Sequence, residues 1–307
     1  MNKLLLVDGN AVLHRAYYAL PDWRNRSGEA TAGVYGFLSM ILKAIEELKP
    51  THLAVVFDCP EPTFRHTMYV GYQVTREKDR QVSEDIWGQV EKLKIVFEKM
   101  GVPVFAVPSF EADDVIGTLA KQSTDGEVII ITGDRDLMQL VNEKVKLFMP
   151  QKGLSDAVLV DGEKVIQRLG VHPKQVVDYK GLMGDSSDNY PGVAGIGPKT
   201  AAHLLAEHGS LKDIYKQITN TKPNDTKKPK IVPAITDKLI KGYDAAMLSK
   251  QLATIRTDVP VSWEPEKASV PSEEKILAVL KELGYKSLVK RINQNEEIDE
   301  NQQKLFE

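Results

Sequence analysis

The amino-acid sequence predicts a doubly wound α/β domain with a mostly parallel sheet, followed by an all-helical domain. In the first half of the chain, short apolar runs alternate with helical stretches, which is the rhythm of βαβ units. These runs lack polar–apolar alternation, as is typical of strands that helices cover on both faces. From residue 176 the pattern is helical, with glycine-rich breaks and no convincing strand. We therefore expect domains at residues 1–175 and 176–290, and a flexible acidic tail at 291–307.

The expected strands of the first domain are short and apolar, and they lie at residues 3–7, 52–57, 102–107, 128–132 and 145–149. A helix over residues 32–48 connects the first two strands, and shorter helices are expected at 111–123 and 137–141. The highly charged stretch 64–100 is longer than a crossover needs, so part of it is expected to stand away from the sheet. The Lys-, Pro- and Asn-rich segment 219–233 is expected to form a basic loop.

Composition limits the class of protein. The 307 residues are 42% apolar and 27% charged, which is typical of a soluble globular chain, and no apolar run approaches the ~20 residues that span a bilayer. The single cysteine excludes an intrachain disulfide or a multi-cysteine metal site and fits a reducing cytosol, so we expect a cytoplasmic protein. Cys59 itself is expected to be a buried thiol and not a metal ligand.

Acidic residues recur where the expected strands end. Because the carboxyl ends of parallel strands meet at one edge of a sheet, where ligands bind in such folds, these side chains should lie close together. Two further aspartates occur in the segment MGDSSDN at the start of the helical region. The sequence thus predicts nine carboxylates in one cleft, namely Asp8, Asp58, Glu111, Asp113, Asp114, Asp134, Asp136, Asp185 and Asp188.

Nine like charges in one cleft require cations. Two carboxylates ~4 Å apart repel by about 4 kcal/mol at an effective dielectric constant near 20. Oxygen ligands without His or Cys favour Mg²⁺ or Mn²⁺ over Zn²⁺, and two such ions can activate water and stabilise the leaving oxygen of a phosphodiester. The alternative is that each acidic residue is a turn or helix-capping residue. This alternative accounts well for one acid after a strand, but less well for acids at four points along a single edge of the sheet.

A glycine-rich hairpin, PGVAGIGPKTA at residues 191–201, follows the last two aspartates. Gly195 and Gly197 are expected to adopt positive φ angles, and Pro198 suits a first helical turn. Lys199 adds charge beside unpaired backbone N–H groups, a combination that binds phosphate. The alternative is a tight helix–helix connection.

The charge distribution also favours a DNA partner. Residues 199–250 contain ten lysines and five acidic residues. Without the nine clustered acids the formal net charge of the chain changes from −3 to +6, and a protein that binds the DNA backbone requires such a positive surface.

The segments LLLVDG, VVFD…TFRH, EADD, TGDRDL, GLMGDSSDNYPGVAGIGPKTA and LATIRTDVP occur in this order over residues 1–290. With them the chain resembles the 5′–3′ exonuclease domain of bacterial DNA polymerase I and its free-standing relatives, in the flap endonuclease superfamily. The resemblance implies a PIN-like α/β domain, a helical arch at about 64–100, and a helix–three-turn–helix (helix-hairpin-helix) domain that grips duplex DNA. It also implies two Mg²⁺ or Mn²⁺ ions and a K⁺ bound by hairpin carbonyls.

The resemblance assigns roles to particular residues. The nine acids match metal ligands, and Arg65, Tyr72 and Arg76 match catalytic positions at the strand exit and in the arch. Tyr72 and Arg76 would share one face of a helix, where Tyr72 could stack on a frayed base and Arg76 could clamp the scissile phosphate. Contacts to DNA are expected from Lys180, Gly195, Gly197, Lys199 and Thr200.

Two features depart from the family pattern. Gln73 stands where the family has an arch lysine, and the following EKDRQVSED replaces a proline-rich segment, so turnover or the preference between flaps and ends is expected to differ unless Lys78 or Arg80 supplies the charge. No polymerase module follows residue 290, so we expect a free-standing enzyme or a natural truncation. We also expect a monomer. The tail reads QQKLF, and Gln302, Leu305 and Phe306 resemble peptides that dock on the bacterial sliding clamp; the alternative is a tail with two chance hydrophobic residues.

The function expected from the sequence is that of a metal-dependent 5′–3′ exonuclease and 5′-flap endonuclease, which cuts DNA at 5′ ends and single-strand/duplex junctions in replication and repair. A structure-specific DNA-binding accessory without turnover is one alternative, but no such protein benefits from nine repelling acids. A toxin-like PIN ribonuclease is another, but it leaves the duplex-gripping segment unexplained. The preference for flaps or ends, and for DNA or an RNA primer, stays open.

Overall fold

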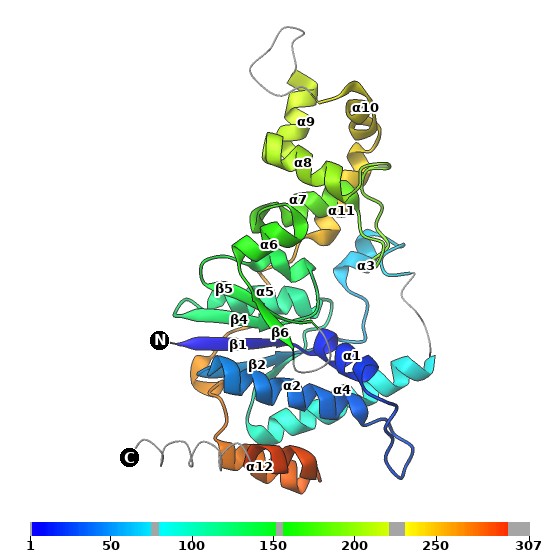
Figure 1. Cartoon of the computed structure of the whole chain (residues 1–307). Coiled ribbons are helices and arrows are strands. Elements are labelled where there is room, and N and C mark those ends of the chain that lie inside the picture. Colours follow the sequence, from blue (N-terminus) through cyan, green and yellow to red (C-terminus); the bar gives the residue numbers. More distant parts are fainter. Residues whose placement is uncertain (1, 75–79, 152–155, 221–230, 294–307) are drawn as a thin grey trace.

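The computed structural model describes residues 2–74, 80–151, 156–220 and 231–293. A sheet with helices on both faces forms one end of the molecule, and a narrower helical extension rises from it, with α8, α9 and α10 farthest from the sheet (Figure 1). None of the described helices is both long and apolar enough to cross a lipid bilayer.

The sheet has six strands in the order β3-β2-β1-β4-β5-β6, and all neighbouring pairs are parallel except β5 and β6. Their bounds are β1 Lys3–Asp8, β2 His52–Val56, β3 Val104–Phe105, β4 Glu127–Ile131, β5 Val145–Pro150 and β6 Ala157–Val160. In register, Leu5 of β1 lies between Leu53 and Ile129, so β1 is central, and it is buried from Leu4 to Asp8. This burial is why its sequence is a continuous apolar run.

Alternate side chains of β1 enter two separate cores, because successive residues of a strand point to opposite faces. Leu5 and Val7 pack with α1 (Gly9–Ala19), α2 (Ala32–Leu48) and α4 (Arg80–Met100). Leu4 and Leu6 face the opposite layer, which consists of α5 (Ala112–Gln122), α6 (Gly162–Leu169) and α7 (Val176–Met183). The doubly wound fold is thus confirmed.

The helical extension consists of α8 (Pro198–His208), α9 (Leu211–Asn220), α10 (Pro233–Lys241) and α11 (Tyr243–Ala253). α11 packs along α7 and so joins the extension to the sheet layer (Figure 1). The remaining elements are short or peripheral: α3 Phe64–Met68, the 3-10 turns Asp136–Leu140, Pro173–Gln175 and Pro265–Lys267, and α12 Glu273–Glu282. Beyond residue 176 the described part of the chain holds only isolated bridges and no strand, as expected.

Two elements were not expected from the sequence, α1 and β6, and β6 runs antiparallel to β5. Part of the charged stretch 64–100 was expected to stand away from the sheet; within it, residues 80–100 form α4 and bury Val90, Leu93 and Phe97 against the core. Its high charge lies on the outer face of an amphipathic helix, which a count of charges along the sequence does not show.

α12 also lies elsewhere than expected. Although residues 176–290 were expected to form one helical domain, α12 packs on α4 at the opposite end of the molecule from α10 (Figure 1). Leu280 is fully buried there, and Lys99 and Glu282 form an ion pair of 2.7 Å. Ser269 pairs with His52 at the start of β2, so the chain returns along the edge of the sheet before α12 begins.

Candidate active site

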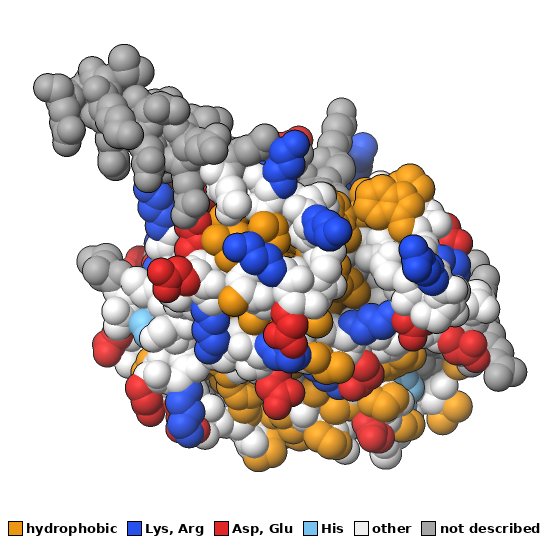
Figure 2. All heavy atoms as spheres, turned by 90° about the horizontal axis from the view of Figure 1, so that it is seen from below, with side chains coloured by type: hydrophobic (Ala, Val, Ile, Leu, Met, Phe, Trp, Pro, Cys, Tyr) orange, Lys and Arg blue, Asp and Glu red, His pale blue; other side chains and the backbone are white. Residues whose placement is uncertain are grey.

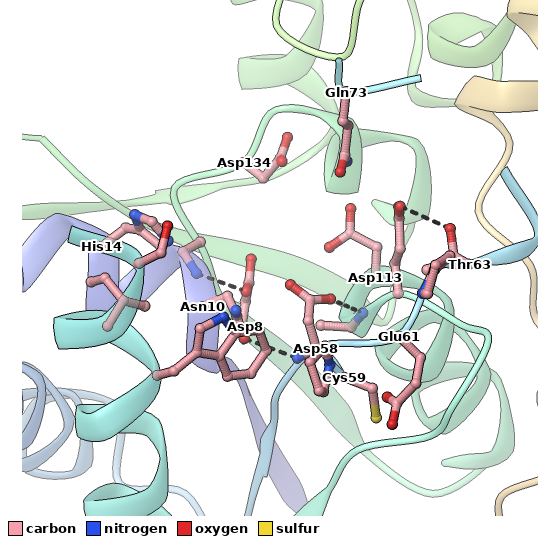
Figure 3. A pocket seen from close by; sticks show the side chains of 18 of the residues that line it. Asp8, Asn10, His14, Asp58, Cys59, Glu61, Thr63, Gln73, Asp113 and Asp134 are labelled. Atoms are coloured by element: carbon pink, nitrogen blue, oxygen red, sulfur yellow. Dashed lines mark hydrogen bonds between the residues drawn. The ribbon is translucent and has the colours of Figure 1, made fainter. Parts of the chain in front are cut away.

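A cavity of about 670 Å³ opens at the carboxyl ends of the central strands, and carboxylates from four separate segments line it (Figure 3). The structure therefore brings together five of the predicted ligands: Asp8, Asp58, Glu111, Asp113 and Asp134. His14 of α1 and Trp87 of α4 also line this cavity.

Helix caps hold two of these carboxylates in place. Asp8 ends β1 and caps α1, accepting hydrogen bonds from the Ala11 N–H (3.1 Å) and from the Thr132 hydroxyl (2.7 Å). Asp58 accepts the N–H of Ala112 at the start of α5 (2.7 Å). Asp8 and Asp58 therefore both hydrogen-bond to the start of a helix and line the cavity. The two roles are compatible, because each helix begins at the edge of the sheet where the cavity opens.

Burial makes this cluster unfavourable in its ionised form. It raises the pKa of Asp8 and of Glu111 to about 7 each, and it raises that of Asp113 well above the usual value, with a further contribution from the charge of Asp134. A divalent cation would remove this penalty, since it stabilises the ionised carboxylates. The donor set consists of oxygen atoms, which fits Mg²⁺ or Mn²⁺.

A second cluster lies beside the first. One carboxylate oxygen each of Asp136, Asp185 and Asp188 lies within 4.8 Å of the others. Although burial lowers the pKa of Lys180, the neighbouring Asp136 and Asp185 raise it overall, and its ammonium group contacts both. Lys180, expected to contact DNA phosphate, therefore lies among the acids in this structure.

Gln73 connects the two clusters. Its side-chain amide donates a hydrogen bond to the Asp188 carboxylate (3.2 Å), and its backbone N–H donates to the Asp188 carbonyl (2.9 Å). The side chain also lines the main cavity, where it points toward the carboxylates (Figure 3). Gln73, which departs from the family pattern, thus lies within the site. Its backbone φ angle is 55°.

Two expected roles are corrected by the structure. Asp114 is fully buried and forms two hydrogen bonds with the Arg65 guanidinium (2.7 and 2.9 Å), so it faces away from the cavity. Arg65 is 2% exposed and also donates to the carbonyls of Leu252 and Thr254. Asp114 is therefore not placed as a metal ligand, and Arg65 is not placed to touch a substrate. Together they tie α3 and α5 to the end of α11.

Tyr72 is also buried, at 4% exposure, so its ring is not available to stack on a base here. Its hydroxyl donates to Glu111 (3.1 Å), and the side chain orients that carboxylate. Residues 71–74 form a turn, and the helical face that Tyr72 and Arg76 were expected to share extends beyond the described residues. Arg76 and Lys78 lie outside the described residues, as do Gln302, Leu305 and Phe306.

The hairpin bears out part of the expected geometry. Gly195 has a φ of +78°, whereas Gly197 has a φ of −97° and forms the N-cap of α8, so only the first needs glycine for its backbone angle. Pro198 is the first residue of α8, Lys199 is exposed and Thr200 is half-buried. The Gly195 carbonyl accepts a hydrogen bond from Lys238 (3.1 Å).

Several residues that orient the acids were not foreseen. Asn10 accepts the N–H of Asp58 (2.9 Å), and Thr132 holds Asp8. Both residues lie within two positions of the end of a strand that is followed or ended by an aspartate, and this pattern in the sequence could have identified them. Tyr190, beside the second cluster, carries no comparable signal.

Two family models match the chain. The N-terminal resolvase-like domain of 5′–3′ exonucleases matches residues 3–170, and their C-terminal SAM fold matches residues 171–276. The chain belongs to the 5′–3′ exonuclease family.

This family includes parts of longer enzymes. DNA polymerase I of Bacillus subtilis is 36% identical to the chain over 307 residues, which is 99% of the chain and 34% of the polymerase. DNA polymerase I of Bacillus caldotenax is 38% identical over 294 residues, or 94% of the chain and 32% of the polymerase. The chain thus spans about a third of the length of these relatives.

Solved structures share the exonuclease fold. A variant of the bacteriophage T5 flap endonuclease, in complex with DNA and metal ions, superposes with a TM-score of 0.67 at 19% identity, over 83% of this chain and 90% of its own. The catalytic core of Rad2 in complex with a DNA substrate has a TM-score of 0.56 at 19% identity, over 92% of this chain and 87% of its own. At such identity the likeness establishes the fold.

Proposed function

We propose that this nuclease hydrolyses DNA phosphodiesters at 5′ ends and 5′ flaps with the help of divalent cations. The observation that carries the proposal is the convergence of buried and half-buried carboxylates at the edge of the sheet, among them Asp8 and Glu111, whose pKa values are raised. DNA as the substrate is supported by the two structural neighbours, which are complexes with DNA. Roles in replication and repair follow by analogy with the polymerases that carry this domain.

Two groups of residues would hold Mg²⁺ or Mn²⁺. One is the set that lines the main cavity, and the other is the triad Asp136, Asp185 and Asp188. When bound, two such cations supply an activated water and compensate the charge of the leaving oxygen. The protein contributes fixed ligands: Thr132 holds Asp8, and Tyr72 and Arg65 hold Glu111, with Arg65 at 3.2 Å.

The hairpin and α8 are the proposed contact with the DNA backbone. The exposed Lys199 and the first backbone N–H groups of α8 would bind phosphate. Figure 2 shows the opposite, α12 end of the molecule, where basic and acidic side chains are interspersed, as suits a solvated face. A potassium ion at the hairpin would use carbonyl oxygens other than that of Gly195, to which Lys238 already donates.

The function is tested with a 5′-flap DNA, incubated with the protein in the presence and absence of Mg²⁺ or Mn²⁺. We expect cleavage only with the cation, and none above background for Asp134→Ala, which removes a carboxylate of the main cavity. Binding of the flap without metal-dependent cleavage would instead support a DNA-binding accessory protein.

Gln73→Lys is expected to increase the cleavage rate about 3- to 10-fold, because an ammonium group at this position would add positive charge beside the reacting phosphate. Gln73 already lines the cavity, so a lysine at this position would place its ammonium group in the cavity. Single-turnover cleavage with saturating Mg²⁺ measures the effect, and Gln73→Met provides a neutral control. An unchanged or lower rate would show that another cation serves this role.

The metal-free protein should become less stable as the pH rises from about 4 to about 7. Burial raises the pKa of Asp8, Glu111 and Asp136 to about 7, so each binds its proton more tightly folded than unfolded. The stabilisation is complete below the unfolded pKa near 4 and is lost as the pH passes the folded value. Melting in EDTA should be at least ~5 °C lower at pH 8 than at pH 5, and Mn²⁺ should remove most of that difference.

A pH-independent melting temperature in EDTA would contradict this arrangement of carboxylates. The comparison with Mn²⁺ at the same two pH values is the control for titration elsewhere in the chain.

We also propose that the tail docks on a sliding clamp through Gln302, Leu305 and Phe306, which lie outside the described residues. Deletion of residues 302–307 is expected to abolish clamp binding in a surface-capture assay and to leave cleavage of free flap DNA unchanged. A truncated chain that still binds the clamp would refute the assignment.

A further inference from the structure

The hydroxyl of Tyr190 is a buried polar group whose partner is missing. Tyr190 is 3% exposed, and its hydroxyl oxygen has no hydrogen-bond partner among the residues that the structure describes. An unsatisfied buried hydroxyl destabilises a fold, whereas phenylalanine would fill the same space without that cost. The position therefore calls for a partner that the described residues do not supply.

The backbone places this side chain beside the second acidic cluster. Tyr190 and Asp185 form an isolated antiparallel bridge, in which each backbone N–H donates to the other's carbonyl at 2.9 Å. Tyr72, Leu252 and Ala253 pack around the ring and hold it in place. The hydroxyl thus has a defined position relative to the triad and little freedom to turn elsewhere.

The surroundings of the ring agree with this placement. Burial raises the pKa of the Tyr190 hydroxyl, and the negative charges of Asp136 and Asp185 raise it further. A cavity of about 330 Å³, lined by Tyr190, Asp185 and Asn189, adjoins the cluster and has room for water.

We propose that Tyr190 is a positioning residue of the Asp136–Asp185–Asp188 site, whose hydroxyl donates a hydrogen bond to a water of hydration of the cation bound there. The inference rests on the proposed function, since it requires a cation at this cluster. Mg²⁺ and Mn²⁺ favour carboxylate and water ligands, and Mg²⁺ keeps several waters when it binds to few carboxylates. A fixed donor on one of these waters orients it, as outer-shell groups do at other metal sites.

The test is Tyr190→Phe, with melting temperature as a readout that needs no cleavage. In EDTA the variant should melt about 3 °C above the wild type, because an unsatisfied hydroxyl has been removed. With saturating Mn²⁺ this advantage should disappear. The half-saturating Mn²⁺ concentration of one of the two proposed sites, measured by calorimetry, should rise about 5- to 10-fold, and that of the other should not change.

Tyr215→Phe is the matched control. The Tyr215 hydroxyl donates to the Leu239 carbonyl (3.0 Å) in the helical extension, so its loss should lower the melting temperature equally with and without Mn²⁺. Tyr190→Phe would overturn the proposal if it behaved like this control, or if it left the Mn²⁺ affinity unchanged. A wild-type protein that Mn²⁺ does not stabilise would overturn the proposed metal site as well.

Discussion

Asp113→Asn is expected to abolish cleavage while making the metal-free protein more stable. Asp113 lines the main cavity among Asp8, Glu111 and Asp134, and removing one ligand of a metal site should reduce the cleavage rate by at least ~10²-fold. The pKa of Asp113 is raised by burial and by the charge of Asp134, so its ionisation opposes folding above the unfolded pKa near 4. Asparagine does not titrate and removes this penalty, which should raise the free energy of unfolding at pH 8 by at least ~1 kcal/mol.

Single-turnover cleavage of a 5′-flap DNA and urea unfolding in EDTA at pH 8 measure the two effects. Mn²⁺ should stabilise the variant much less than the wild type, because the stabilisation by a ligand follows its affinity for the folded state. A variant that keeps its rate, or that unfolds more easily in EDTA, would show that Asp113 is not a cation ligand in a repulsive cluster.

Asp114→Asn, one residue further along, is expected to have the opposite effect on stability. Asp114 is fully buried, forms two hydrogen bonds with Arg65 and accepts the N–H of Arg256 (2.8 Å). Loss of its charge leaves the guanidinium buried, with Glu111 at 3.2 Å as the remaining ionic partner within the described part of the chain. Breaking a buried ion pair in this way costs about 3–5 kcal/mol, and the remaining contact to Glu111 places the expected loss near the lower end.

Urea unfolding in EDTA measures this loss, and Asp113→Asn is the internal control because it removes the same charge from the neighbouring position. The number of Mn²⁺ ions bound, measured by calorimetry on the folded protein, should not change in Asp114→Asn. If the variant instead lost a bound ion and kept its stability, the ligand role implied by family resemblance would be correct after all.

Much of the fold was accessible from the sequence because the information is local. Strands such as β1 and β4 are short apolar runs between breaks, and their burial on both faces requires this pattern. β6 was not foreseen, because Ala157–Val160 is a four-residue strand at the sheet edge that only its pairing with β5 defines. The position of α12 was not foreseen either, since nothing within the helix specifies α4 as its neighbour.

The residues of the functional site also differ in how far local sequence patterns predict them. Local patterns were sufficient to find the acids, since a strand end followed by Asp can be read from a few residues, as at Asp8 and Asp58. They were not sufficient to assign roles to Arg65, Tyr72 and Lys180, which were expected to act on the substrate and are instead held by Asp114, Glu111 and the second acidic cluster. Asp114, Glu111 and Asp136 lie more than thirty residues from the side chains that they hold, whereas Asp185 is five residues from Lys180.

By itself the sequence determined that this chain folds around a parallel sheet, carries an excess of carboxylates at one edge and belongs among nucleases of 5′ ends. Only the tertiary structure decided that Asp113 faces the cavity while Asp114 faces Arg65. Adjacent residues of a helix point about 100° apart, so two neighbouring aspartates enter different surroundings. Those surroundings are built by segments distant in sequence, and no local pattern contains them.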